Sequence, residues 1–347
     1  MKKFFSSAIC RKGYTSTYHT IYKKDPSAKV LIATYGDDFE RATFFNQLIE
    51  NFRGFNLTVF NPFFDEAPDG IYIENLNTYI ISDGGYSKIS PILLGSWEKF
   101  IKITESKNYP SDLQREIIGL KIKENDFYKK GCDHLKTACK TREKLHEAIS
   151  PHLNDRKIIN FVSRFCLRSF RDIDTFGKGE IRLLSSPTPL GIHTHYDTIF
   201  DNFEKVIEIK DHTSFAGSVI LGVLRDYALR EQIPFIMSPS YFANDIPDAI
   251  IFPAISTCIL ITDENHILPF EPYESISAMR FLNSDYINDD KMVKALISAE
   301  NSFLDKCVFS LFNGRDTRYK VSDLTKGYCD SEEAMTSANK LTEKLMI

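Results

Sequence analysis

Two short segments of the chain combine glycine, hydroxyl and charged residues directly after an apolar run. They span residues 35–43 and 211–218, and each is followed later by a second apolar run that ends in an aspartate. In phosphate-binding loops, glycines let backbone N–H groups approach the phosphates, a cation contacts them, and a hydroxyl and a later aspartate hold Mg²⁺. The candidate residues for nucleotide binding are Gly36, Arg41, Thr43, Asp83, Ser214, Gly217, Ser218 and Asp263.

The first segment departs from the phosphate-loop pattern G-x-x-x-x-G-K-[ST] at most of its fixed positions. Tyr35 and Glu40 stand where the pattern has glycine, Arg41 stands at the lysine, and Ala42 stands at the hydroxyl position. Thr43 follows one residue later, about 100° farther around a helix, so its hydroxyl is expected to point elsewhere. This segment keeps a cation without the glycines.

The second segment has lost different parts of the pattern. Asp211 and Ala216 replace the glycines and Gly217 replaces the lysine, whereas Ser218 keeps the hydroxyl. If a nucleotide binds, Mg²⁺ would be held through Ser218 and Asp263. Otherwise no metal site is expected.

Electrostatics weakens the case for nucleotide binding in the first segment. Asp37, Asp38 and Glu40 oppose the single Arg41. A carboxylate about 4 Å from a phosphate charge costs about 4 kcal/mol near a protein surface. Loss of a lysine contact removes roughly 1.5–3 kcal/mol more. We therefore expect at most weak binding of ATP or GTP, with little or no hydrolysis.

The two aspartates that end apolar runs have two interpretations. Asp83 and Asp263 could support Mg²⁺ or act as a base, or they could be turn or cap residues after a strand. The sequence Asp83-Gly84-Gly85 is typical of a turn. Both interpretations stay open for both residues.

These candidate residues belong to an internal repeat. The segment at 13–22 matches the segment at 191–200, with glycine, tyrosine, threonine and isoleucine coinciding at 13/191, 18/196, 20/198 and 21/199. Apolar runs then recur in the same order, at 30–33 and 206–209, at 57–60 and 234–237, and at 78–83 and 257–263. Recurrence of order and spacing indicates duplication of one structural unit.

The repeated unit predicts an α/β fold. Short continuous apolar runs are typical of strands in a parallel sheet that is buried on both faces. Apolar residues at i, i+4 and i+8 predict a helix after the first strand of each copy, with core faces at Phe44, Leu48 and Phe52 and at Ile220, Leu224 and Ala228. Alternation of strands and helices indicates a doubly wound α/β arrangement.

The order of these elements resembles a bacterial family of tandem P-loop ATPase-like proteins found in spore-forming bacteria. The resemblance is carried by the Gly-x-x-x-x-Tyr segments at Gly13 and Gly191, the degenerate loops, and the later strands ending in aspartate. It implies two tandem P-loop NTPase-like three-layer domains, with mainly parallel sheets and helical C-terminal extensions. We place the first domain at 1–176 and the second at 180–347.

Composition narrows the class of partner. The 347 residues carry a formal net charge of −4, which argues against a general nucleic-acid binder. No stretch approaches the roughly 20 apolar residues of a membrane span, and Arg11 and Lys12 interrupt the apolar N-terminal run that a signal peptide would need. We expect a cytoplasmic protein without a membrane partner.

Three functions remain open. The first is a degenerate ATPase-like nucleotide binder with any residual site around Ser214, Gly217, Ser218 and Asp263. The second is a catalytically inactive scaffold that holds a partner protein through the paired domains. The third is a small-molecule phosphotransferase in which Arg41 contacts the phosphate. The loop backbone discriminates between the first two, because binding needs an open cradle of N–H groups whereas a filled loop favours the scaffold.

Overall fold

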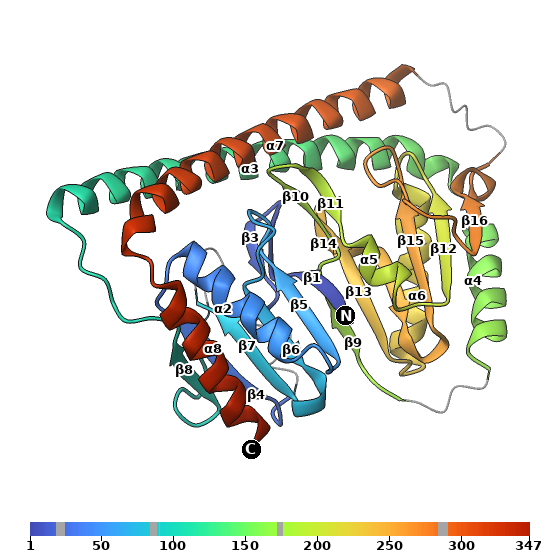
Figure 1. Ribbon diagram of the computed structural model, residues 1–347. Coiled ribbons are helices and arrows are strands. Elements are labelled where there is room, and N and C mark those ends of the chain that lie inside the picture. The colour runs from blue at the N-terminus through green and yellow to red at the C-terminus, as the bar shows by residue number, and fades with distance from the viewer. Residues whose placement is uncertain (19–24, 84–88, 90, 172–175, 284–290) are drawn as a thin grey trace. The chain divides into compact units, whose positions relative to one another are not determined.

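The computed structural model describes residues 1–18, 25–83, 89, 91–171, 176–283 and 291–347. The chain forms two compact units. Unit 1 contains Met1–Cys132, Pro187–Gly191 and Cys307–Ile347, and unit 2 contains Asp133–Ser186 and Ile192–Lys306. Each unit is an α/β structure with its own sheet (Figure 1).

Among the described residues, the sheet of unit 1 has six strands in the order β1-β5-β6-β7-β4-β8. β4 runs parallel to β7 and β8, β1 runs parallel to β5, and β5, β6 and β7 form an antiparallel meander. The apolar runs predicted at 30–33, 57–60 and 78–83 lie in β4, β5 and β7. The strands are β1 (Lys2–Phe5), β4 (Lys29–Thr34), β5 (Leu57–Asn61), β6 (Gly70–Ile73), β7 (Thr78–Ser82) and β8 (Glu98–Lys102).

The sheet of unit 2 repeats this order strand for strand, as β9-β13-β14-β15-β12-β16. A short hairpin follows the first strand of each copy, β2 (Ser7–Cys10) with β3 (Gly13–Ser16), and β10 (Ser185–Thr188) with β11 (Gly191–Thr194). The duplication inferred from the sequence therefore recurs in the topology. The strands of the second sheet are β9 (Gly179–Ile181), β12 (Lys205–Lys210), β13 (Phe235–Ser240), β14 (Ala243–Phe252), β15 (Thr257–Thr262) and β16 (Glu274–Ser277).

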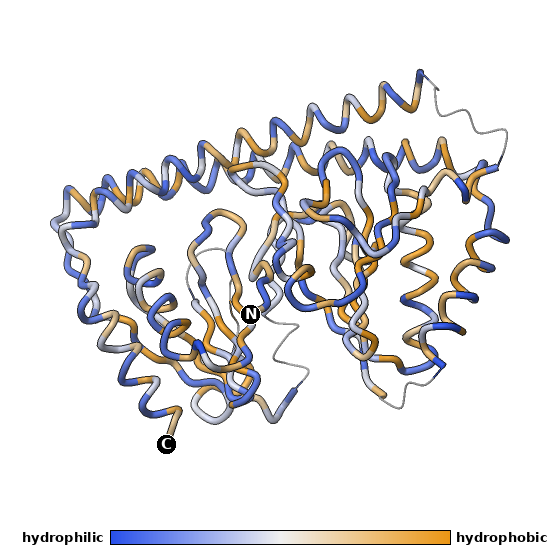
Figure 2. The backbone as a smooth tube through the Cα atoms, turned by 45° about the vertical axis from the view of Figure 1, so that its right-hand side comes forward, coloured by the Kyte–Doolittle hydropathy of each residue, from blue (hydrophilic) through white to orange (hydrophobic). Residues whose placement is uncertain are grey.

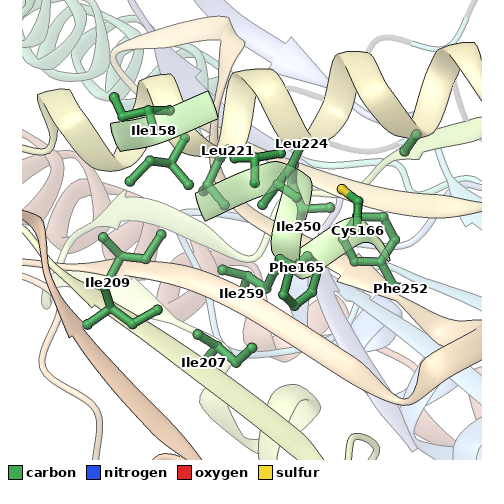
Figure 3. Close-up of a cluster of buried hydrophobic side chains, with 14 of the residues drawn as sticks. Ile158, Phe165, Cys166, Ile207, Ile209, Leu221, Leu224, Ile250, Phe252 and Ile259 are labelled. Atoms are coloured by element: carbon green, nitrogen blue, oxygen red, sulfur yellow. The ribbon is translucent and has the colours of Figure 1, made fainter. Parts of the chain in front are cut away.

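One helix follows the first parallel strand of each copy, as predicted. In unit 1, α2 (Asp38–Asn51) buries Phe44 and Leu48 against the sheet, and α8 (Ser331–Met346) packs on it. In unit 2, α6 (Phe215–Arg230) buries Ile220, Leu224 and Ala228, and α4 (Asp155–Ser169) packs on it. Figure 3 shows this second core, in which Phe165 and Cys166 of α4 meet Ile250 and Ile259 of the sheet.

Two long helices pass from one unit to the other. α3 (Ser111–Ile149) leaves unit 1 after Cys132, and α7 (Lys291–Thr325) leaves unit 2 after Lys306. Hydrophilic and hydrophobic positions alternate along both helices (Figure 2). A helix of 39 residues is about 58 Å long, more than one small domain spans.

The compact units therefore differ from the two consecutive domains predicted at 1–176 and 180–347. The boundary near Phe176 marks where the repeat restarts, but α4 belongs to unit 2 and α8 belongs to unit 1. Each helical extension packs on the helix that the other copy contributes. Because α3 and α7 each continue from one unit into the other, the extension that follows each helix belongs to the unit that holds the other copy's sheet.

The remaining helical segments are short. Within the described residues, none of the helices is both long and apolar enough to cross a bilayer. The short segments are α5 (Tyr196–Phe200) and the 3₁₀ turns η2 (Glu74–Leu76), η3 (Ser150–His152), η4 (Pro253–Ile255), η5 (Ala278–Phe281) and η6 (Lys326–Tyr328).

Candidate functional site

The connection between β4 and α2 is closed by carboxylates of the protein itself. Asp37 Oδ1 accepts a hydrogen bond from the Glu40 N–H at 3.0 Å, and Glu40 Oε2 accepts one from the Asp37 N–H at 3.0 Å. This reciprocal capping box occupies N–H groups that a phosphate would use at a helix N-terminus. The first loop is therefore filled.

Glu40, which stands at a glycine position of the phosphate-loop pattern, is fully buried. Its Oε1 accepts hydrogen bonds from Lys107 Nζ at 2.5 Å and from the Asp330 N–H at 2.6 Å. Its Oε2 also accepts a bond from the Thr104 hydroxyl at 3.2 Å. These donors satisfy both oxygens of the buried carboxylate, and the side chain occupies the place that a bound anion would need.

The connection between β12 and α6 is filled in a similar way. The buried Asp211 carboxylate accepts bonds from the Thr213 N–H at 3.0 Å and from its hydroxyl at 2.7 Å. Its second oxygen accepts a bond from the Gly217 N–H at 2.9 Å. Asp211 thus takes the place of a bound anion at the start of α6.

The candidate residues of the first loop serve this local structure. Gly36 has a φ of +88°, a conformation that glycine adopts without strain. Arg41 forms an ion pair with Asp38, and the Thr43 hydroxyl donates to the Phe39 carbonyl at 2.9 Å. The cation and the hydroxyl are therefore already engaged.

The candidates of the second loop separate into two groups. Ser218 donates to the Ser214 carbonyl at 2.5 Å, and a Cβ on Gly217 would lie 2.9 Å from Ile261 Cγ1, so both residues serve the packing of α6. By contrast, Ser214 and Asp263 meet, because the Ser214 hydroxyl donates to Asp263 Oδ2 at 3.2 Å. Ser214 has a φ of +54°, which turns the chain into the helix.

The two strand-end aspartates have different surroundings. Asp83 is exposed, its N–H donates to the Ala33 carbonyl at 3.0 Å, and burial of part of its carboxyl raises its pKa. Gly84 and Gly85, which would complete the predicted turn, lie outside the described residues. The side chain of Asp263 is buried, and it is the centre of a polar cluster.

Asp263 and His266 form a fixed pair in that cluster. His266 Nδ1 lies 2.9 Å from Asp263 Oδ1, which also accepts bonds from the N–H groups of Asn265 and His266. Burial acts to raise the pKa of Asp263, but His266, Arg142 and the Asn265 N–H together outweigh it and hold that pKa well below its usual range. Burial likewise acts to lower the pKa of His266, and the Asp263 carboxylate raises it instead.

The outer side of His266 is enclosed. The Tyr241 ring stacks on the imidazole at 5.8 Å, and among the described residues neither His266 Nε2 nor the Tyr241 hydroxyl has a hydrogen-bond partner. Ser214 contacts the aspartate rather than Nε2. The three groups therefore lack the order of a nucleophile, base and orienting acid, in which the nucleophile bonds to the free ring nitrogen.

A buried arginine links this cluster to the helices. Arg142 of α3 pairs with Glu300 of α7 through two hydrogen bonds, one of them from Nε at 2.6 Å. Its Nη1 donates to the Thr213 carbonyl at 3.3 Å, and its Nη2 lies 3.9 Å from Asp263 Oδ2. The guanidinium also lies 4.3 Å from the centre of the Phe242 ring.

Unit 1 contains the same arrangement of side chains around a buried arginine. Arg318 of α7 pairs with Glu124 of α3 at 2.9 Å and with Asp38, and its guanidinium lies 4.1 Å from the centre of the Phe64 ring. Each unit therefore holds a buried arginine against a glutamate, a phenylalanine and its strand-to-helix loop. Burial acts to lower the pKa of both arginines, but their carboxylate partners outweigh it and raise both values.

Our interpretation of the sequence missed these arginines and glutamates, although a signal for them exists. Glu124 and Glu300 are 176 residues apart, as are Arg142 and Arg318. Each glutamate begins the pattern Glu-Asn-x-Phe, and a threonine precedes each arginine. If the comparison of the two copies had been continued into the charged helices, it would have singled out these two glutamates and two arginines.

A second pair of equivalent acids lies in the antiparallel part of each sheet. Asp69 Oδ1 accepts a hydrogen bond from the Tyr18 hydroxyl at 2.7 Å. Burial raises the pKa of Asp69 to about 6, and it raises the pKa of Asp248 to about 6. Both acids occur in the Pro-Asp step of the repeat, so each half retains a carboxyl whose pKa is raised by burial.

A cavity of about 450 Å³ lies in unit 1 beside the loop of β4. It borders on Gly36 and Arg41, two of the residues selected from the sequence. Ligand sites in open α/β sheets lie outside the carboxyl ends of the parallel strands, which is where this cavity lies. Among the described residues, no group of three or more histidine, cysteine and acidic side chains is arranged to hold a metal ion.

Comparison with protein-family models, with curated proteins and with solved structures finds no match to this chain.

Proposed function

We propose that this chain is a catalytically inactive scaffold that binds a partner protein, rather than an ATPase. The observation that carries the proposal is that both strand-to-helix loops are filled by their own carboxylates, Asp37 with Glu40 and Asp211. A phosphate would have to displace these groups and remain beside their charge. That repulsion is about 4 kcal/mol per carboxylate near a protein surface.

The test is calorimetric titration of ATP and GTP, each with Mg²⁺, into the full chain. We expect no heat of binding and no thermal shift at about 1 mM nucleotide, an affinity limit near −4 kcal/mol. Micromolar binding that Ser218→Ala weakens would overturn the proposal and return the second loop to nucleotide binding.

A stripe of exposed aromatic residues on α7 supports protein binding. Phe309, Phe312 and Tyr319 are 67%, 47% and 48% exposed, and Arg315 lies over the rings of Phe312 and Tyr319. These spacings place the three rings on one side of the helix. Aromatic and arginine side chains are the residues that dominate the energy of protein–protein interfaces.

The stripe gives the scaffold proposal a second test. The double variant Phe309→Ser/Phe312→Ser should lose the partner that the wild-type chain retains in reciprocal affinity purification. Leu167→Ser is the matched control, because Leu167 of α4 is 72% exposed but lies outside the stripe. Equal retention by all three proteins would exclude the stripe as the interface.

A further inference from the structure

The cavity beside the β4 loop has the dimensions of a small-molecule site. Its volume of about 450 Å³ falls within the range of roughly 300–1,000 Å³ that ligand pockets occupy. Its lining residues belong to unit 1 and come from the loop before α2, the first turn of α2, the segment before α3, the first half of α3 and the second half of α7. Its charged and aromatic lining residues include Asp38, Arg41, Tyr109, Lys121, Glu124 and Arg318.

A smaller void of about 20 Å³ shares three of these walls, namely Asp38, Arg41 and Arg318, and is also lined by Asp69. A void of this size holds one water-sized group. Arg318 is 4% exposed and Asp69 is 6% exposed, so both charges at the void are buried.

Each of these two residues presents an unused polar atom. Among the described residues, Arg318 Nε and Asp69 Oδ2 have no hydrogen-bond partner. The Ser6 hydroxyl is near enough to favour the charged form of Asp69, but it too has no hydrogen bond. The residues that carry this buried donor and this buried acceptor both line the small void, and buried polar groups are normally satisfied.

Only some chemical groups satisfy both atoms. Above pH 6, where the Asp69 carboxyl is mostly ionised and can only accept, a carboxylate or a phosphate dianion accepts from Arg318 but has no hydrogen to donate to Asp69. An ammonium donates to Asp69 but cannot accept from Arg318. A hydroxyl does both, because it carries one donor hydrogen and two acceptor lone pairs.

The charges around the larger cavity favour a neutral ligand. Arg318 bridges Asp38 and Glu124, Arg41 pairs with Asp38, and Lys121 Nζ lies 2.9 Å from Glu124. A charged ligand would have to break one of these pairs. Hydroxyl groups can instead bond to the unused lone pairs and hydrogens of the same side chains.

The remaining walls suit the same kind of ligand. Asn125, Ser322 and Thr325 offer uncharged hydrogen-bonding groups, and Tyr109 and Ile117 offer apolar surface. A sugar ring has both hydroxyl edges and an apolar face. We propose that this cavity binds a neutral polyhydroxylated ligand the size of a monosaccharide, with one hydroxyl in the inner void between Arg318 and Asp69.

The experiment uses the full chain and two groups of probes. The neutral group is glucose, galactose, mannose, ribose and myo-inositol, and the charged group is glucose 6-phosphate and citrate. Binding is measured by saturation-transfer NMR and calorimetry. At least one neutral probe should bind at or below about 10 mM, and more tightly than either charged probe.

Two variants locate the binding. Ala42→Leu should fill the inner void, which Ala42 lines, and Asp69→Asn should replace the acceptor with an amide. Each should weaken the neutral probe about tenfold or more. Matched controls are Asn46→Leu, one turn later on α2 and exposed, and Asp248→Asn, the equivalent position of unit 2; both should leave affinity unchanged.

Circular dichroism and melting curves establish which variants fold. If Asp69→Asn does not fold, the affinity of Ala42→Leu decides the test. The proposal is overturned if no neutral probe binds, if a charged probe binds more tightly, or if the folded Ala42→Leu variant keeps full affinity. Failure of the sugar binding leaves the scaffold proposal unaffected, because that proposal rests on the filled loops and on the stripe of α7.

Discussion

Asp69 and Asp248 show how strongly burial acts on single residues in this fold. Burial raises the pKa of each carboxyl to about 6, from an ordinary value of 3.8. Between these two pH values the folded chain holds a proton that the unfolded chain has released. The stabilisation is therefore complete below pH 3.8 and is lost as pH rises through about 6, by about 3 kcal/mol for each group.

The variant Asp69→Asn should remove one of these contributions. Its amide oxygen can still accept from Tyr18, but it does not titrate. Between pH 4 and pH 7.5 its free energy of unfolding should fall less than that of the wild type, by up to about 3 kcal/mol. Urea unfolding of both proteins at both pH values measures this difference. His266 and Asp263 contribute equally to the pH dependence of the two proteins, so their contribution cancels in the comparison. Parallel pH profiles would contradict the raised pKa.

A second prediction about single residues concerns the buried arginines. Arg142→Met leaves Glu300 buried without its partner and removes a cation from Asp263. Such a loss costs about 3–5 kcal/mol, whereas Arg142→Met/Glu300→Leu should recover much of it, because an apolar pair needs no desolvation of charge.

The matched control for Arg142 is the exposed pair of Arg115 with Asp112 on the same helix. Arg115→Met should cost less than about 1 kcal/mol, since water screens that pair. Guanidinium chloride unfolding of the four proteins provides the comparison. Similar costs for Arg142→Met and Arg115→Met would refute a stabilising role for the buried pair.

At the scale of elements, the strands and the core faces of α2 and α6 were predictable. Continuous apolar runs and residues such as Phe44, Leu48, Ile220 and Leu224 are local signals that burial confirms. The orientation of the acidic side chains in the loop before α2 was harder to infer. Asp37 and Glu40 were expected to repel a phosphate, and they turn inward to cap α2. Their spacing of three residues is the capping-box pattern, which would have revealed this.

Gly217 is a second case in which packing replaces the expected chemistry. It stands at the lysine position of the phosphate-loop pattern, but the structure uses it to bring α6 close to Ile261 of β15. The contact with Ile261 leaves no room for a side chain at this position. A contact between residues far apart in the sequence cannot be read from the local sequence pattern.

Substitution of this glycine tests the close approach. Gly217→Ala should cost about 1–3 kcal/mol, because its Cβ would lie 2.9 Å from Ile261 Cγ1. Gly222→Ala on the same helix meets nothing within 4 Å and should stabilise the chain by up to about 1 kcal/mol. Thermal and urea unfolding of both variants measure the contrast. Equal stabilisation by the two alanines would show that α6 and β15 are not so closely packed.

At the scale of the whole molecule, the duplication was predictable but the exchange of helices was not. The repeat places each helical extension after its own sheet, and sequence spacing alone cannot show which sheet it covers. That choice depends on the lengths of α3 and α7 and on contacts between residues more than a hundred positions apart, such as Arg142 with Glu300. Long-range pairing of this kind is set by tertiary packing.

The exchange predicts that the consecutive halves are not independent folding units. A fragment of residues 1–176 lacks α8, whose Ala334 and Ala338 cover Phe44 and Leu48 of α2. Its apolar surface would be exposed, so we expect weak or no cooperative unfolding. Co-expression with residues 177–347 should restore the missing helix and a stable complex.

The control is a chain that contains all the main segments of unit 1, with residues 1–132 joined to residues 307–347 by a short glycine–serine linker. The two ends are adjacent, because a Cβ on Gly131 would lie 3.6 Å from the Cys307 carbonyl oxygen. This chain should unfold cooperatively in urea although it has about the same length as the 1–176 fragment. Size-exclusion chromatography and circular dichroism compare the two. If 1–176 folds alone as stably as the linked chain, α8 is not needed by the first sheet, and the helical extensions can pack within their own halves.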